Sequence, residues 1–125
     1  MNLILDTSIL IEIERKNKIV IDRLNELKSL YPAPPRISFV SYFEYLYGLR
    51  AKSAKNKEKL KSFAELFNVI HTTNNTANFL VLLKEKYELP LADLLIAAQA
   101  IETNGLLVTK DKDFENIKEI EKIII

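Results

Sequence analysis

The chain has 125 residues, of which 48% are hydrophobic and 28% charged, and its formal net charge is +1 at pH 7. This balance is typical of one soluble globular domain large enough to bury a core, and it means that a nucleic-acid partner would have to meet a local basic face. The absence of cysteine excludes a disulfide scaffold, a thiolate zinc site and a cysteine nucleophile, and it suits a reducing cytoplasm.

The first stretch, MNLILDTSILIEIE, predicts a short buried strand followed by a helix. Residues 3–5 are an apolar run too short for a helix, and the three residues after them are typical of helix starts. Asp6 interrupts the run, so the stretch lacks the apolar centre of a signal peptide. No apolar run approaches the roughly 20 residues of a membrane span. We therefore expect a cytoplasmic protein that does not contact a membrane.

Strands and helices alternate along the rest of the chain. The predicted elements are, in order, helices over residues 9–16 and 19–30, a strand over 37–40, helices over 41–49 and 60–67, a strand over 69–71, helices over 77–87 and 92–103, and strands over 106–109 and 122–125. Their boundaries come from the proline-rich segment YPAPP at 31–35, the lysine-rich joint AKSAKNKEK at 51–59 and the helix stop at Asn104 and Gly105. Such alternation predicts an α/β domain with a parallel or mostly parallel sheet, covered by helices on both faces.

Acidic residues recur at the points where predicted strands end. Asp6 follows the first strand, Glu44 lies one turn into the helix after the second, and Asp111 follows the fourth. The carboxyl ends of parallel strands share one edge of the sheet, which is where such folds place their sites. Asp93, in the first turn of a helix that feeds the fourth strand, reaches the same edge if that crossover is right-handed. We expect these four acids to converge there, with Asp113 close by.

Each acid also has a structural explanation when it is taken alone. Asp6 could simply cap the first helix. The sequence from Ser41 to Glu44 has the form of a capping box, and the helix dipole favours an anion at Asp93. The last two aspartates could form a turn between lysines. Taken one at a time, the acids do not indicate a functional site. Their shared position at one edge of the predicted sheet is what distinguishes such a site from separate structural roles.

The joint pattern favours a metal centre. Carboxylates gathered at one edge repel one another, and keeping them neutral would require large upward pKa shifts. A divalent cation removes the conflict, because hard oxygen ligands suit Mg²⁺ or Mn²⁺. Thr7, Ser8 and Thr109 supply hydroxyls that can orient the carboxylates. The chemistry indicated is phosphodiester hydrolysis, in which one metal activates water and a second, roughly 4 Å away, stabilises the leaving oxygen.

Four blocks of the sequence resemble those of the PIN-domain ribonucleases, most closely the VapC-like toxins of prokaryotic toxin–antitoxin pairs. They are LILDTSILI at the N-terminus, SYFEYLYGL at 41–49, ADLLIAAQA at 92–100 and LVTKDKDF at 107–114. The resemblance implies a single PIN-like nuclease domain over residues 1–125, folded as a three-layer α/β/α sandwich with four to five mostly parallel strands. It also implies an endoribonuclease that uses Mg²⁺ or Mn²⁺ to cut single-stranded RNA.

The resemblance assigns roles to individual residues. Carried over by position, the metal-binding acids are Asp6, Glu44, Asp93 and Asp111. Thr109 is similar to the family's supporting hydroxyl. Asp113 matches a further acid that binds or supports the metal in some members, so the division of roles between it and Asp111 stays open. By the same resemblance, the partners expected are a cognate antitoxin and a second copy of the chain.

Basic residues around the predicted site would attract RNA to it. The candidates for phosphate contacts are Arg15 and Lys16 after the first helix and Arg50 and Lys52 after the third. A solvated helix face explains these residues at least equally well.

The helix over 41–49 carries three tyrosines, of which Tyr42 and Tyr45 share a face while Tyr47 points elsewhere. We expect Tyr42 and Tyr45 to belong to the core. At least one tyrosine is expected to be exposed, where it could stack on a base or contact an antitoxin.

Two alternatives keep the PIN-like fold: an RNA-processing nuclease without a toxin role, and a non-catalytic binding scaffold. A phospho-acceptor signalling domain fits poorly, because it needs adjacent acids after the first strand and Asp6 stands between Leu5 and Thr7. A titration with Mn²⁺ separates the enzyme from the scaffold.

Overall fold

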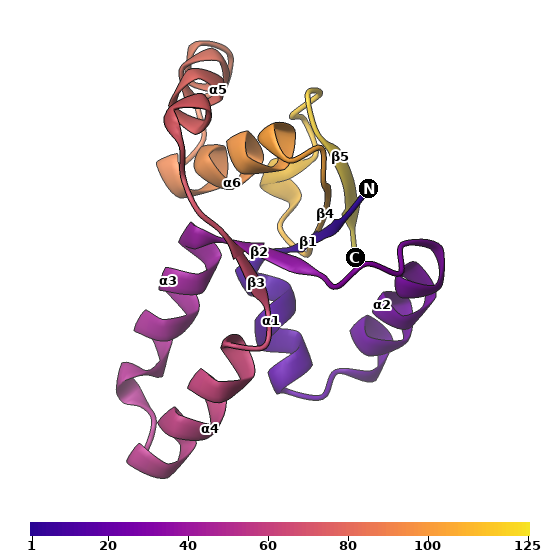
Figure 1. The fold of residues 1–125 in the computed structure, drawn as a ribbon, viewed down its shortest axis with the longest axis vertical. Coiled ribbons are helices and arrows are strands. Elements are labelled where there is room, and N and C mark those ends of the chain that lie inside the picture. The colour runs from indigo at the N-terminus through magenta and orange to yellow at the C-terminus, as the bar shows by residue number, and fades with distance from the viewer.

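The computed structural model describes residues 1–125 as alternating strands and helices (Figure 1). The strands are β1 (Leu3–Leu5), β2 (Arg36–Ser38), β3 (Asn68–Ile70), β4 (Leu106–Thr109) and β5 (Glu121–Ile124). The α-helices are α1 (Thr7–Glu14), α2 (Lys18–Leu30), α3 (Phe39–Gly48), α4 (Ala54–Ala64), α5 (Asn74–Lys86) and α6 (Leu91–Glu102). Short 3-10 helices, η1 (Leu49–Ala51) and η2 (Lys112–Phe114), follow α3 and β4.

The five strands form one sheet in the order β3-β2-β1-β4-β5, and every neighbouring pair is parallel. Leu5 at the end of the central strand pairs in register with Ile37 of β2 and Val108 of β4. The residues that follow these three strands are therefore brought to one edge of the sheet. The predicted α/β class and strand number are confirmed, and the sheet is parallel throughout.

Helices cover both faces of the sheet, which gives three layers (Figure 1). Helices α1 to α4 pack on one face together with Leu3 and Leu5, whereas α5 and α6 pack on the other with Ile4 and Leu107. Alternate residues of β1 thus enter opposite cores, as the two-residue period of a strand requires. No helix of the protein has the length and apolar character needed to cross a membrane.

The second strand ends earlier than the sequence predicted. Phe39 and Val40 belong to α3 and not to β2. Ser38 caps this helix, because its Oγ accepts the Ser41 N–H at 3.0 Å, and the Phe39 N–H donates to Gln99 Oε1 at 3.2 Å. Ser41 therefore lies inside the first turn, and the capping box predicted on it does not form.

The lysine-rich joint at 51–59 is largely helical as well. Helix α4 begins at Ala54, where the Ser53 Oγ accepts the Asn56 N–H at 3.4 Å, and it ends at Ala64. The predicted helix over 60–67 was therefore placed too late. A helical turn that faces solvent all round lacks the apolar periodicity by which helices are recognised in sequence. The other helix boundaries lie within three residues of their predicted positions.

Candidate metal centre

Asp6 is held in place at the junction of β1 and α1. It is 6% exposed, and it caps α1 by accepting the Thr7 N–H on Oδ1 at 2.8 Å. Its other carboxylate oxygen accepts hydroxyls from Ser8 at 3.1 Å and Thr109 at 2.7 Å. The same hydrogen bonds therefore have two roles: they start α1, and they fix the direction of the Asp6 carboxylate.

The loop after β4 is folded against the same hydroxyls. Thr109 Oγ1 accepts the Asp111 N–H at 2.9 Å, and Ser8 Oγ accepts the Lys110 N–H at 3.0 Å. Asp111 then accepts the Asp113 N–H on Oδ1 at 2.9 Å and thereby caps η2. Thr109 thus connects the position of Asp6 to that of the two aspartates that follow β4.

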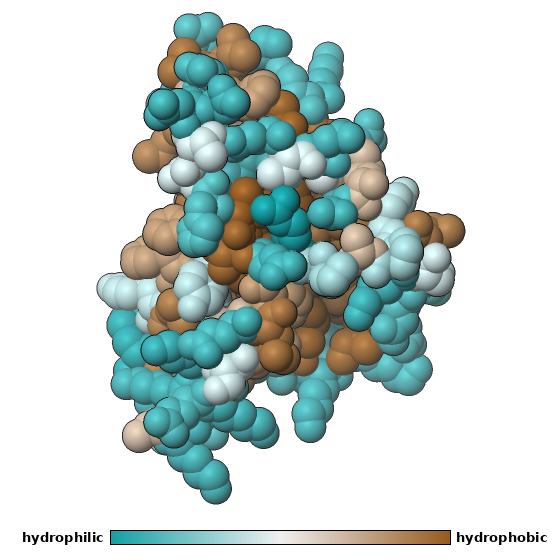
Figure 2. Space-filling view, in the orientation of Figure 1, coloured by the Kyte–Doolittle hydropathy of each residue, from teal (hydrophilic) through white to brown (hydrophobic).

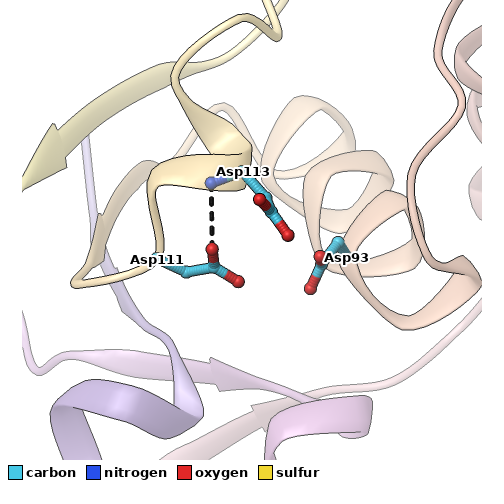
Figure 3. A group of neighbouring side chains, drawn as sticks. All are labelled: Asp93, Asp111 and Asp113. Atoms are coloured by element: carbon cyan, nitrogen blue, oxygen red, sulfur yellow. Dashed lines mark hydrogen bonds between the residues drawn. The ribbon is translucent and has the colours of Figure 1, made fainter.

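Three carboxylates meet above this loop. Asp93 projects from the first turn of α6 toward Asp111 and Asp113, and one oxygen from each of the three lies within 4.8 Å of the others (Figure 3). Asp93 and Asp111 are half-buried and Asp113 is exposed. The structure therefore brings both candidates for the fourth acid to Asp93 and does not choose between them.

Glu44 reaches the edge from the second turn of α3. It is exposed, and its Oε1 accepts the Thr7 hydroxyl at 2.8 Å. Because Ser38 caps α3, the Glu44 side chain is free for this contact across the sheet edge. Thr7 therefore joins Glu44 to the start of α1. All three predicted hydroxyl residues make hydrogen bonds with the acids or with the backbone of the loop after β4.

The negative charges of the other four acids act on Asp93. Burial, the largest cause, and the charges of Asp111, Asp113, Asp6 and Glu44, in that order, together raise the pKa of Asp93 to about 6. None of the five forms a salt bridge with a lysine, an arginine or the histidine. Coulombic coupling to Asp93 therefore links all five acids, and no protein cation balances them.

This donor set fits a hard divalent cation. Clustered carboxylate oxygens without a basic partner suit Mg²⁺ or Mn²⁺, whereas a soft ion would need cysteine or histidine ligands. The chain has no cysteine, and its one histidine, His71, is not a member of the group of acids. Asp93, Asp111 and Asp113 are grouped tightly enough to share one ion, and Asp6 and Glu44 flank them.

Comparison with known proteins decides the family. The family model of the PIN domain matches residues 3–120. The chain belongs to the PIN domain family. The family resemblance read from the four sequence blocks is thus confirmed. Because PIN domains are generally nucleases, membership supports a hydrolase that acts on nucleic acid.

Solved structures of toxin–antitoxin systems share this PIN fold. A chain of a toxin–antitoxin complex from Klebsiella pneumoniae is 25% identical, with a TM-score of 0.80 over 99% of this chain and 100% of that one. VapBC2 from Rickettsia felis, solved with a DNA fragment from its promoter, is 23% identical, with a TM-score of 0.83 over 99% and 98%. VapBC-1 from nontypeable Haemophilus influenzae is 24% identical, with a TM-score of 0.78 over the same shares. No curated protein matches the sequence.

A cavity of about 180 Å³ opens beside the acids of the PIN domain, between α1 and α3. Thr7 and Glu44 line it together with two of the predicted basic residues, Arg15 and Lys52. Both cations are near acids, since Arg15 lies 3.8 Å from Glu12 and Lys52 lies 3.9 Å from Glu14. In both pairs the contact is long and the cation is exposed, which leaves the Arg15 and Lys52 side chains able to turn toward another anion.

The other two predicted basic residues do not line this cavity. Lys16 is exposed at the end of α1 with a left-handed backbone (φ 58°), and it lines a separate cavity that it shares with Lys52. Arg50 donates to the Tyr47 carbonyl at 2.9 Å, and its guanidinium lies 3.9 Å from the centre of the Tyr47 ring. Arg15 and Lys52 are therefore the members of the set that share a cavity with Glu44.

The tyrosines of α3 have different environments. Tyr45 is buried, and its hydroxyl donates to Glu14 at 3.2 Å, while Tyr42 is half-buried against the core. Tyr47 is 57% exposed and stacks on the exposed Phe43. Sequence reasoning missed Glu14, which lines the cavity and accepts from Tyr45. Glu14 follows Thr7 by seven residues and so lies on the same face of α1, and this spacing was the available signal.

Proposed function

We propose that this PIN domain, residues 1–125 acting as one unit, is a divalent-metal-dependent endoribonuclease that hydrolyses phosphodiester bonds of single-stranded RNA. The supporting observation is the group of Asp93, Asp111 and Asp113, whose carboxylate oxygens lie within 4.8 Å of one another without any basic partner. Folding alone would disfavour such a group, because like charges crowded in a half-buried place cost free energy. A bound divalent cation would offset this repulsion, so the group is explained by metal binding.

The proposed metal ligands are Asp93, Asp111 and Asp113, with Asp6 and Glu44 beside them, and the catalytic acids are Asp6, Glu44, Asp93 and Asp111. When bound, Mg²⁺ or Mn²⁺ supplies activation of water and charge stabilisation at the cleaved phosphate. The protein holds the acids still: Asp6 through three hydrogen bonds, Asp111 through its own N–H and Glu44 through Thr7. Carboxylates fixed in this way need little reorganisation when the ion and the phosphate arrive.

Arg15, Lys16, Arg50 and Lys52 are proposed to hold the RNA backbone on the way to this centre. Arg15 and Lys52 are the nearest, because they line the same cavity as Glu44. Contacts of this kind position a strand without reading its sequence. They also place positive charge close to the acids, which lowers the repulsion that an incoming phosphate meets.

We further propose that the chain is the toxin of a type II toxin–antitoxin pair in the cytoplasm, that it forms a homodimer and that a cognate antitoxin restrains it. The support is the likeness to structures whose names describe toxin–antitoxin and VapBC complexes. A PIN nuclease of RNA processing, or a scaffold without catalysis, would share the fold. Expression in bacteria separates them: the wild type should arrest growth and the Asp93→Asn variant should not.

The direct test is cleavage of polyuridylate and total cellular RNA with Mg²⁺ or Mn²⁺. Asp93→Asn should abolish cleavage, and it should also remove the rise in melting temperature that Mn²⁺ gives the wild type. Asp22→Asn is the matched control, since Asp22 is an exposed aspartate of α2 paired with Lys18 at 2.9 Å. Equal cleavage by all three proteins would refute the proposal. A chain that shows no stabilisation by Mn²⁺ would instead be a scaffold.

A further inference from the structure

The segment formed by η1 and α4 holds an unusual share of the positive charge of the chain. Residues 50–61 contain six lysines and arginines against one acid, a net charge of +5. The rest of the chain has twelve such cations against sixteen acids, a net charge of −4. A protein with a formal net charge of +1 is therefore strongly polarised, and one short segment carries the positive end.

Four of these cations lie on α4 as two pairs, Lys55 with Lys59 on one side of the helix and Lys57 with Lys61 on the other, together called the α4 lysine row below. All four are exposed, and none makes a salt bridge or a side-chain hydrogen bond. In Figure 1, α4 projects away from the sheet beside α3, and Figure 2 shows hydrophilic side chains covering that end of the molecule. The row is thus presented to solvent on a protruding element.

The row disfavours the helix that carries it. Lys55 and Lys59, like Lys57 and Lys61, are separated by four residues, and like charges at this spacing destabilise a helix. Lys55 and Lys57 also lie in the first turn, where the helix dipole repels cations. Packing requires only the other face of α4, through Leu60, Phe63 and Ala64. Solvation of that outer face would be met as well by balanced charges, whereas α4 carries the four lysines of the row against the single acid Glu58 among them, and this excess of positive charge indicates a polyanionic partner.

A path of cavities links the row to the metal centre. The cavity lined by Glu44 and Lys52 borders a second one, of about 370 Å³, with which it shares Glu14 and Lys52. The second cavity lies between α1 and α4 and is lined by Lys59 and Lys16. On the opposite side of α4, a cavity of about 320 Å³ is lined by three cations, Arg50, Lys57 and Lys61. Positive side chains therefore follow the surface from the acids to both sides of α4.

We infer that the α4 lysine row is a second RNA-binding surface, which contacts the sugar–phosphate backbone of the substrate away from the cleaved bond. The inference rests on the proposed function, because it takes the polyanion to be the RNA that enters the metal centre. Lysines four residues apart on a helix are about 6 Å apart along its axis. Spaced, flexible cations of this kind track a backbone without base specificity. The row would hold long RNA substrates and leave very short ones unaffected.

The test compares two variants that each remove four positive charges, from different parts of the surface. One is K55Q/K57Q/K59Q/K61Q in the row, and the other is K18Q/K28Q/K84Q/K118Q, four exposed lysines elsewhere. Binding of polyuridylate is measured by fluorescence anisotropy over a range of salt, with EDTA present so that nothing is cleaved. Loss of four single-strand phosphate contacts should lower the slope of log K against log salt by about 3, which is about 50-fold across a fourfold rise in salt. The control variant should keep the slope of the wild type.

Each outcome decides the inference. Equal slopes in the two variants would overturn the inference, because RNA binding would then depend on net charge alone or on another surface. Unchanged RNA binding by the row variant, together with lost binding of polyglutamate, would assign the surface to an acidic polypeptide instead. Thermal unfolding of both variants checks that they are folded. Because binding is measured in EDTA, the result does not depend on catalysis, and failure of the proposed nuclease activity would appear separately as cleavage that Asp93→Asn leaves unchanged.

Discussion

At the carboxyl edge of the sheet, five acids lie among hydrogen-bonded and partly buried groups, whereas on α4 four lysines extend into solvent without partners. Both regions gather charge of one sign, but only the first is fixed. Fixed charges suit an ion with strict demands on ligand geometry, and mobile charges suit a flexible polyanion. The acidic edge should therefore respond to metal and pH, and the lysine row should respond to salt.

The fixed character of the acidic edge depends most on Thr109. Thr109→Val removes a hydroxyl that donates to Asp6 and accepts from Asp111, so both acids lose their orientation. We expect Mn²⁺ affinity and cleavage to fall by about 10- to 100-fold, as is usual when a group that orients a ligand is lost. Isothermal titration calorimetry measures the affinity. Thr72→Val, at an exposed threonine, is the control, and an equal effect of both variants would show that the hydroxyl of Thr109 does not matter.

The stability of the metal-free protein should depend on pH through Asp93. Its carboxyl has a pKa of about 6 in the folded protein and about 3.8 in the unfolded chain, so the folded state binds more protons between these values. Stability should therefore fall as pH rises from about 4 to 6 and stay low above, by about 1 to 2 kcal/mol after allowance for solvent screening. Urea unfolding in EDTA measures the effect.

Two controls locate that pH effect at Asp93. Asp93→Asn should flatten the fall between pH 4 and 6, because the titrating carboxyl is gone. Mn²⁺ at pH 7 should restore the stability of the wild type and leave the variant unchanged. A pH profile that is the same in both proteins would place the titrating group elsewhere and would mean that the acids are less coupled than the pKa of Asp93 indicates.

The hydrogen bond between Glu44 and Thr7 at the start of α1 is more exposed, so its loss should matter less. Thr7→Val removes the hydroxyl that donates to Glu44, and we expect cleavage to fall about fivefold, which corresponds to one exposed hydrogen bond to a charged group. Thr7→Ser keeps the hydroxyl and should retain most of the activity. If Ser and Val behave alike, Glu44 is held by α3 alone.

The gathering of acids at one edge of the sheet could be predicted from the sequence, because the order of the strands places the residues that follow them. Asp6 and Asp111 come directly after strands that pair in parallel, and a short apolar strand between helix signals is easily recognised. The start of α3 was misplaced because Phe39 and Val40 favour strands by type, whereas the hydrogen bonds of Ser38 and Gln99 that start the helix are invisible to propensity. The segment 51–59 was predicted to be a connecting joint because the first half of α4 has no apolar face. Without apolar residues at helical spacing, the sequence gives no signal of a helix there.

The smallest expected effect concerns the cost of the lysine row to the fold. Replacing Lys59 and Lys61 by glutamine removes one member of each like-charged pair, so the protein should become more stable at low salt by about 0.5 to 1 kcal/mol. The gain should vanish at high salt, because screening removes the repulsion in the wild type. Thermal melts at the two salt concentrations measure it, with K84Q/K118Q as a control that changes net charge equally. A protein destabilised by K59Q/K61Q would show that these lysines support α4, and the partner inferred from their repulsion would lose its physical basis.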